Sequence, residues 1–199
     1  MMMLPTEAER SRLLSFMREL ERLKENCRTA WTSSGKRESI AEHSWRLAMF
    51  AFILEDYFPK LDFYKVVQLS LVHDLGEAFE GDVSATIAVN REEKAQTEEA
   101  ALLRLSSLLP DNSRQKLLAL WAEYNSGESK EARLVKALDK METIIQHNQG
   151  KNPADFDYGF NLQYGKELAQ FHPLLALLRE QVDNETRKKM GEKQSESEK

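Results

Sequence analysis

Histidines are the side chains best suited to bind a metal ion or carry a proton near neutral pH, and this sequence has four of them. His73 is followed directly by Asp74 and lies near the end of a predicted helix, on a stripe with Ser70. His43 lies one turn into another predicted helix, on a stripe that is otherwise apolar. Because a buried imidazole needs partners for its ring nitrogens, both positions are candidates for a site.

Asp139 interrupts the apolar stripe of a third predicted helix, between Val135 and Ile145. A lone buried carboxylate is costly unless it is paired, protonated or bound to a metal. Each group also has a structural explanation: a core histidine bonded to backbone, a helix-terminal His-Asp pair, or an aspartate paired with Lys136 or Lys140. Taken together, two imidazoles and two carboxylates from three helices favour a mixed nitrogen and oxygen site for Mn, Co, Fe, Zn or Mg.

The elements that must position these residues are predicted to be helices. The chain has only 8 Gly and 5 Pro in 199 residues, its apolar side chains recur every three or four positions, and no segment is more typical of a strand. We therefore expect an all-α bundle of about seven helices, in which the second helix, apolar almost all round, is the buried central one. The predicted helices span residues 6–26, 41–57, 62–76, 91–108, 111–125, 128–149 and 161–182.

Composition narrows the class of protein. The formal net charge of -5 argues against a nucleic-acid polymer as partner, because such surfaces are usually basic. The single cysteine, Cys27, fits a reducing compartment, and no apolar run is long enough for a spanning helix or a leader. We expect a soluble cytoplasmic protein with one domain over residues 1–182. Residues 183–199 are highly charged and are expected to form a disordered tail.

Three segments carry a family resemblance: RESIAEHSWRLA, LVHDLGEAFEGD and ARLVKALDKMETIIQHN, in that order. They resemble the signature blocks of the HD-domain metal-dependent phosphohydrolases and are most similar to the 5'-deoxynucleotidase branch, over roughly residues 10–182. The resemblance implies an HD-domain helical bundle and one divalent metal ion. It implies that this ion is held by His43, His73, Asp74 and Asp139.

The same resemblance implies roles for four further residues. Glu77 and Asp82 correspond to the carboxylates that act on the phosphate or the attacking water. Arg28 and Trp31 correspond to residues that contact phosphate and nucleoside. Lys36 or Arg37, in the polar loop before His43, would assist Arg28 because their positive charges suit a phosphate. The alternatives are a solvated helix-end charge for Arg28 and core packing for Trp31. His147 and the residues beside it either support the site or simply end their helix.

The function expected from these residues and from the resemblance is removal of phosphate from a small nucleotide, a 2'-deoxyribonucleoside 5'-monophosphate. The resemblance also implies a homodimer. Two alternatives stay open. One is an HD enzyme that cleaves a cyclic nucleotide or a pyrophosphate, and the other is a nucleotide-binding or scaffold protein that keeps the fold without catalysis. Intact Glu77 and Asp82 argue against the second alternative, because a scaffold needs neither.

Overall fold

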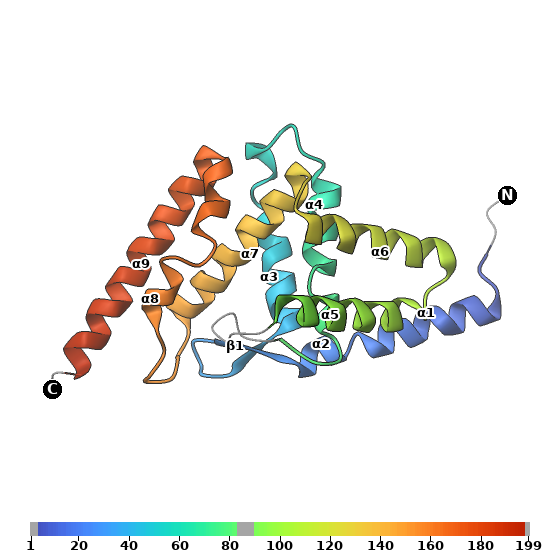
Figure 1. Cartoon of the computed structure of the whole chain (residues 1–199), viewed down its shortest axis with the longest axis horizontal. Helices are drawn as coiled ribbons and strands as arrows, with labels where there is room; N and C mark the ends of the chain where they lie inside the picture. Colours follow the sequence, from blue (N-terminus) through green and yellow to red (C-terminus); the bar gives the residue numbers. More distant parts are fainter. Residues whose placement is uncertain (1–3, 83–89, 198–199) are drawn as a thin grey trace.

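The computed structural model describes residues 4–82 and 90–197, and helices dominate this part of the chain (Figure 1). The α-helices are α1 (Glu7–Glu19), α2 (Arg22–Glu25), α3 (Ile40–Phe52), α4 (Phe63–Val72), α5 (Arg91–Ser106), α6 (Asp111–Ser126), α7 (Lys130–Gln149), α8 (Tyr158–Asn161) and α9 (Pro173–Ser197). The short elements are the 3-10 helices η1 (Glu55–Tyr57), η2 (Leu75–Glu77) and η3 (Lys166–Phe171) and the strands β1 (Cys27–Trp31) and β2 (Arg37–Ser39). The expected all-α class is confirmed.

Helix α3 begins where its local sequence dictates. Ser39 accepts a hydrogen bond from the backbone of Glu42, and the Glu42 side chain accepts one from the backbone of Ser39. This reciprocal capping box satisfies two backbone donors that the first turn of a helix would otherwise leave free. The cap fixes the start of α3, and therefore places His43 in its first turn.

The core lies where α3 and α4 pack against α7. Leu47 of α3, Leu69 of α4 and Leu138 of α7 are fully buried there, and each such side chain contributes about 1.5–3 kcal/mol. The expectation that the second predicted helix is the buried central one is wrong. Helix α3 exposes one face, whereas α7 passes between α3 and α9 and is buried along most of its length (Figure 1).

A hairpin forms directly after the first predicted helix, where the sequence predicted a loop. Strands β1 and β2 pair antiparallel, with Cys27 opposite Ser39 and Trp31 opposite Arg37. Gly35, at φ 87°, takes the left-handed conformation that the turn requires. The prediction that the chain has no strand is wrong. The sequence did not indicate these strands because segments of five and three residues are too short to show a clear alternation of apolar and polar side chains.

The prediction of a disordered tail is wrong for residues 183–197, because they continue helix α9. Asp183 and Thr186 are buried although they are polar. Asp183 pairs with Arg179 at 2.7 Å, and the Thr186 hydroxyl donates to the Asn148 side chain of α7 at 3.0 Å. Arg179 lies one turn earlier in α9, whereas Asn148 lies in α7, so the composition of the tail alone does not reveal that contact.

Helix α9 has 25 residues, but it carries charged side chains along its length. Neither α9 nor another helix in residues 4–82 and 90–197 combines the length and apolarity needed to cross a membrane.

Candidate active site

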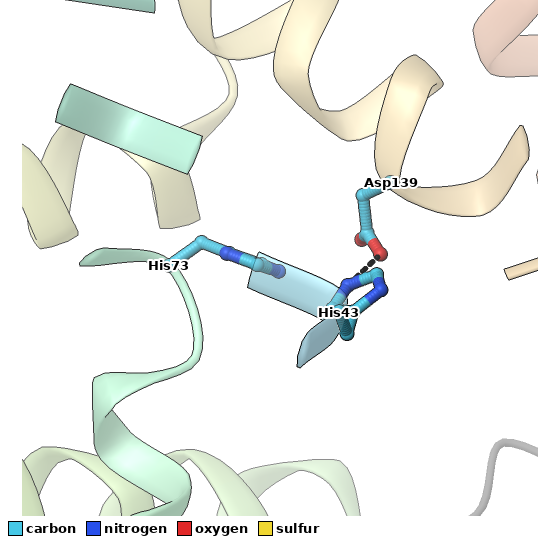
Figure 2. A group of neighbouring side chains, drawn as sticks. All are labelled: His43, His73 and Asp139. Atoms are coloured by element: carbon cyan, nitrogen blue, oxygen red, sulfur yellow. Dashed lines mark ion pairs between the residues drawn. The ribbon is translucent and has the colours of Figure 1, made fainter. Parts of the chain in front are cut away.

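The four residues predicted to bind metal converge from three elements. His43 lies in α3, His73 and Asp74 follow α4 directly, and Asp139 lies in α7. Figure 2 shows His43, His73 and Asp139 pointing toward one another, with ligand atoms within 4.8 Å. The Nε2 atom of His43 is 3.2 Å from Asp139 Oδ1 and 3.8 Å from Asp74 Oδ2, and His73 Nε2 is 3.1 Å from Asp74 Oδ2.

In both histidines, Nδ1 contacts an oxygen of the protein, which leaves Nε2 available to bind a metal. His73 Nδ1 donates to the carbonyl of Ser70 at 2.9 Å, and His43 Nδ1 contacts the Glu142 carboxylate. Because these oxygens accept, the neutral form of each imidazole would carry its proton on Nδ1 and its lone pair on Nε2, as metal binding requires. Without a metal, burial would lower the pKa of His43, but Glu142 and Asp139 outweigh burial and raise that pKa to about 9. Both Nε2 atoms are buried and have no hydrogen-bond partner within the described residues. Two such nitrogens beside two carboxylates fit a divalent metal ion.

Asp139 is held by two groups that point at the same oxygen. The Tyr124 hydroxyl and the Lys140 ammonium each donate to Oδ2 at 2.9 Å, which leaves Oδ1 facing His43. Burial alone would raise the pKa of Asp139, but Lys140 and His43 outweigh it and hold that pKa well below its ordinary value. Pairing of Asp139 with Lys140, the structural alternative, therefore occurs in addition to the clustering of the four residues.

Glu77 lies in η2, one turn after Asp74, and its backbone N–H donates to the Asp74 carbonyl at 3.0 Å. Its side chain is buried, Oε1 is 3.6 Å from Lys94 Nζ, and Oε2 has no hydrogen-bond partner in the described part of the chain. Burial, assisted by the charges of Asp74 and Asp82, raises the pKa of Glu77 to about 9 in the metal-free protein. Glu77 is thus a buried carboxyl group beside the cluster.

Tight packing brings η2 and its carboxylate close to α5. A Cβ on Gly76 would lie 2.8 Å from the Cβ of Glu98, so only glycine fits there without a shift. The Asn26 side chain donates to the carbonyls of Glu77 and Ala78 at 3.1 and 3.0 Å and holds the same turn.

Arg28 is a buried residue of β1, so the alternative of a solvated helix-end charge is wrong. Its Nη2 donates to Thr143 Oγ1 at 3.0 Å, and its Nη1 is 3.3 Å from Glu38 and 3.8 Å from Glu142. Burial opposes the charged form, but the surrounding carboxylates outweigh it and raise the pKa of Arg28. Its Nε has no hydrogen-bond partner within the described residues.

A cleft of about 700 Å³ opens beside the cluster and is within the usual size of a small-molecule site. Arg28 and Thr143 form part of its wall, and Thr143 lies one turn after Asp139 on α7, with its hydroxyl donating to the Asp139 carbonyl at 3.0 Å. Trp31 is half-buried and lines the cleft as well, which disfavours a role in core packing alone. The remaining lining residues are Thr29, Ala30, Asp82, His147, Pro153, Asp155, Phe156, Asp157 and Phe160.

Lys36 and Arg37 are not brought to the site. Lys36 pairs with Glu42 at 2.6 Å on the surface, and the Arg37 side chain donates to the carbonyl of Arg28 at 2.8 Å. Neither residue is among those that line the cleft in the described part of the chain. The hairpin turn directs both side chains to surface partners, which the sequence did not indicate because the hairpin itself was not predicted.

Four supporting residues were not among the predicted site residues: Tyr124, Lys140, Glu142 and Lys94. Glu142 could have been found, because it lies three residues after Asp139 and so shares its helical face. Tyr124 and Lys94 come from α6 and α5, and their contacts depend on how these helices pack.

A helical bundle that gathers two histidines and two aspartates beside a cleft defines the class of protein. Residues 20–179 match the family model of the HD domain, and the chain belongs to this family. It is 37% identical over 139 residues to the human 5'-deoxynucleotidase HDDC2, covering 69% of this chain and 67% of that protein. The HDDC2 protein of Dictyostelium discoideum is 31% identical over 187 residues, covering 88% of this chain and 98% of the relative.

A solved structure agrees with this assignment. A protein described as a predicted metal-dependent phosphohydrolase from Magnetospirillum magnetotacticum MS-1 superposes with a TM-score of 0.77 at 29% identity. The match covers 91% of this chain and 97% of that structure.

Proposed function

We propose that this chain is a metal-dependent 5'-deoxynucleotidase that removes the 5'-phosphate from 2'-deoxyribonucleoside 5'-monophosphates. The observation that carries the proposal is the position of the buried Nε2 atoms of His43 and His73, which lie 3.2 Å from Asp139 and 3.1 Å from Asp74, beside a cleft lined by a buried arginine. The names of the relatives, all 5'-deoxynucleotidases, support the substrate class.

His43, His73, Asp74 and Asp139 would hold one divalent ion, and their donor set suits Mn, Co, Fe, Zn or Mg. When bound, such an ion supplies Lewis acid chemistry, which offsets the negative charge of the phosphate and makes water easier to deprotonate. The contacts at Nδ1 of both histidines, and those at Oδ2 of Asp139, keep the ligand atoms oriented toward one another.

Glu77 is assigned to hold the proton that the attacking water loses. Its Oε2 is buried and has no hydrogen-bond partner among the described residues. Burial raises the pKa of Glu77 in the metal-free protein, and a divalent ion held by the neighbouring cluster would lower this pKa, in the same direction as Lys94 near Oε1, toward the ionised form that a base requires. The water oxygen forms a bond to phosphorus while the bond from phosphorus to the 5'-oxygen breaks. The leaving 5'-oxygen then takes up a proton, and Asp82, which lines the cleft, is assigned to assist this transfer.

Arg28 is assigned to bind the phosphate. Two of its nitrogens are held by Glu38 and Thr143, which fixes the guanidinium, while its Nε keeps a free donor. A guanidinium that is already positioned loses little conformational entropy when it binds an oxyanion. Trp31, which lines the same cleft as Arg28, would pack against the nucleoside.

The test is phosphate release from a panel of nucleotides by the purified protein, after chelation and after re-addition of each metal. The proposal expects turnover of deoxynucleoside 5'-monophosphates that chelation abolishes and one or more divalent ions restore. Turnover of only a cyclic nucleotide or a pyrophosphate would favour another HD hydrolase. Binding of nucleotides without turnover under any metal would favour the non-catalytic alternative.

The proposal includes a homodimer in the cytoplasm. Its support is an exposed apolar face of α3, where Trp45 and Ile53 are 65% and 63% exposed and Met49 and Phe52 lie between them. Such a contiguous face on a helix is typical of an interface, and the single cysteine fits a reducing compartment. Analytical ultracentrifugation tests the proposed homodimer. We expect the parent protein to be a dimer and Ile53→Glu to be a monomer. A monomeric parent protein would refute the proposal.

A further inference from the structure

The cleft beside the metal cluster has two chemically different ends. Arg28, Thr143 and Asp82 form the polar end, which adjoins the cluster. The other end is lined by Trp31 and by the segment at 153–160, which contributes Pro153, Phe156 and Phe160. A ligand that spans the cleft therefore needs an anionic group at one end and an apolar, flat group at the other.

The backbone fixes the aromatic end. The segment after α7 passes beside the hairpin, where the Lys151 N–H donates to the Thr32 carbonyl at 2.9 Å (Figure 1). A Cβ on Gly150 would lie 2.2 Å from the carbonyl oxygen of Trp31, so glycine is needed for this close approach. The two walls of the aromatic end are thus joined through main-chain contacts.

The ring geometry at this end forms a corner. The rings of Trp31 and Phe156 are 6.5 Å apart between centroids and nearly perpendicular, at 86°. Both side chains are half-buried, so each ring keeps accessible surface in the cleft. His147 packs against Phe156 with centroids 4.8 Å apart, and its own Nδ1 lies 2.9 Å from the Asn161 side-chain oxygen. This support holds the Phe156 ring in place before a ligand arrives.

Charge excludes one class of ligand from the aromatic end. Asp155 and Asp157 line the cleft there, and Asp157 Oδ1 accepts from the backbone of Gly159 at 2.8 Å. Carboxylates repel phosphate, but they accept hydrogen bonds from the N–H groups of a neutral heterocycle. The phosphate therefore belongs at the Arg28 end and a neutral, planar group at the other.

We propose that Phe156 is a further substrate-binding residue: together with Trp31, which the proposed function already assigns to the nucleoside, it forms the subsite for the nucleobase, with the base stacked on one ring and its edge against the other. This inference rests on the proposed function, because it takes the phosphate of the same nucleotide to lie at Arg28. Every base has a flat face, so a subsite of this kind supplies affinity without selecting strongly among bases. Phe156 becomes a determinant of affinity for the nucleoside part of the substrate.

The experiment compares a substrate that carries the base, a deoxynucleoside 5'-monophosphate, with 2-deoxyribose 5-phosphate, in which a hydroxyl group replaces the base. Phe156→Ala should raise KM for the nucleotide by roughly 5- to 100-fold, the range for loss of one stacked base, and leave KM for the sugar phosphate unchanged. Phe156→Tyr, which keeps the ring, should behave as the parent protein. Tyr64→Ala removes an exposed ring outside the cleft and should change neither KM.

An equal loss for both substrates would mean that Phe156 is only structural, and no loss for either would mean that the base does not lie there. Both outcomes overturn the proposal. A binding measurement separates this proposal from the proposed function. Ligand NMR compares how the unphosphorylated deoxynucleoside binds to the parent protein and to Phe156→Ala. Binding that depends on Phe156 would support the subsite even if no nucleotide were hydrolysed, and equal binding by both proteins would overturn it.

Discussion

Glu142 contacts Nδ1 of His43 from the same face of α7 that presents Asp139 to Nε2 of that ring. One helix thus contacts both nitrogens of a single imidazole, Nε2 through Asp139, which is proposed as a metal ligand, and Nδ1 through Glu142, which favours a proton on that nitrogen. Burial alone would raise the pKa of Glu142, but His43 and Arg28 outweigh it and lower that pKa, so Glu142 is ionised. Because the same carboxylate lies 3.8 Å from Arg28, it joins the metal cluster to the phosphate-binding end of the cleft.

Replacing Glu142 tests this arrangement. Glu142→Gln should weaken metal affinity by roughly 10- to 100-fold, the usual cost of losing the partner of a metal-binding histidine. Isothermal titration with Mn²⁺ measures the affinity, and circular dichroism shows whether the helices are retained. Glu128→Gln changes an exposed glutamate before α7 and serves as the control. Unchanged metal affinity in a folded Glu142→Gln protein would remove Glu142 from this role.

Asp74 is the metal-binding candidate next to His73, and its loss should leave the remaining three residues unable to hold the ion. Asp74→Ala is expected to retain its helical spectrum, to lose most of its metal and to lose nearly all phosphatase activity. Elemental analysis after dialysis measures the metal, with exposed Asp56→Ala as the matched control. Full metal occupancy in Asp74→Ala would refute the assignment.

Glu77 should separate chemistry from metal binding. Glu77→Gln keeps the shape of the side chain but removes its ability to accept a proton, so turnover should fall by roughly 100-fold or more while metal content stays at the level of the parent protein. Steady-state kinetics and elemental analysis on one preparation give both quantities. Loss of metal together with activity would identify Glu77 as a ligand instead.

The sequence indicated which four side chains lie together because they are in or next to long helices, where periodicity shows which face is buried. His43 and Asp139 stand out as polar residues on apolar stripes, and the motif order adds His73 and Asp74. The structure brings these four side chains together. Their role as ligands remains a prediction that the metal measurements above address.

What the sequence did not predict depends on contacts between distant elements. Phe156 lies in an irregular segment after α7, and contacts of that segment with the hairpin, such as the approach of Gly150 to Trp31, place it in the cleft. Tyr124 reaches Asp139 from α6, and this contact leaves no periodic signal. Lys36 and Arg37 were expected at the phosphate because they precede His43, but the hairpin directs them to the surface. Thr186 was expected in a tail and is buried against Asn148.

Arg28 is expected to affect both catalysis and folding, because it is at once a wall of the cleft and the counter-charge of two buried carboxylates. Arg28→Ala removes a fixed donor from the phosphate and should lower kcat/KM for a deoxynucleoside monophosphate by roughly 100-fold or more. It also leaves Glu38 and Glu142 without their shared cation, and breaking a buried ion pair from one side costs about 3 kcal/mol or more of unfolding free energy. Urea unfolding measures this cost.

A second substitution separates the two effects of Arg28. Arg28→Ala/Glu38→Gln removes one of the stranded charges, so it should recover part of the lost stability without recovering kcat/KM. Lys36→Ala is the matched control, because its partner Glu42 is on the surface and neither kinetics nor stability should change by more than about 0.5 kcal/mol. If kcat/KM rose together with stability in the double variant, the kinetic loss would be a consequence of misfolding, and Arg28 would not be the phosphate ligand.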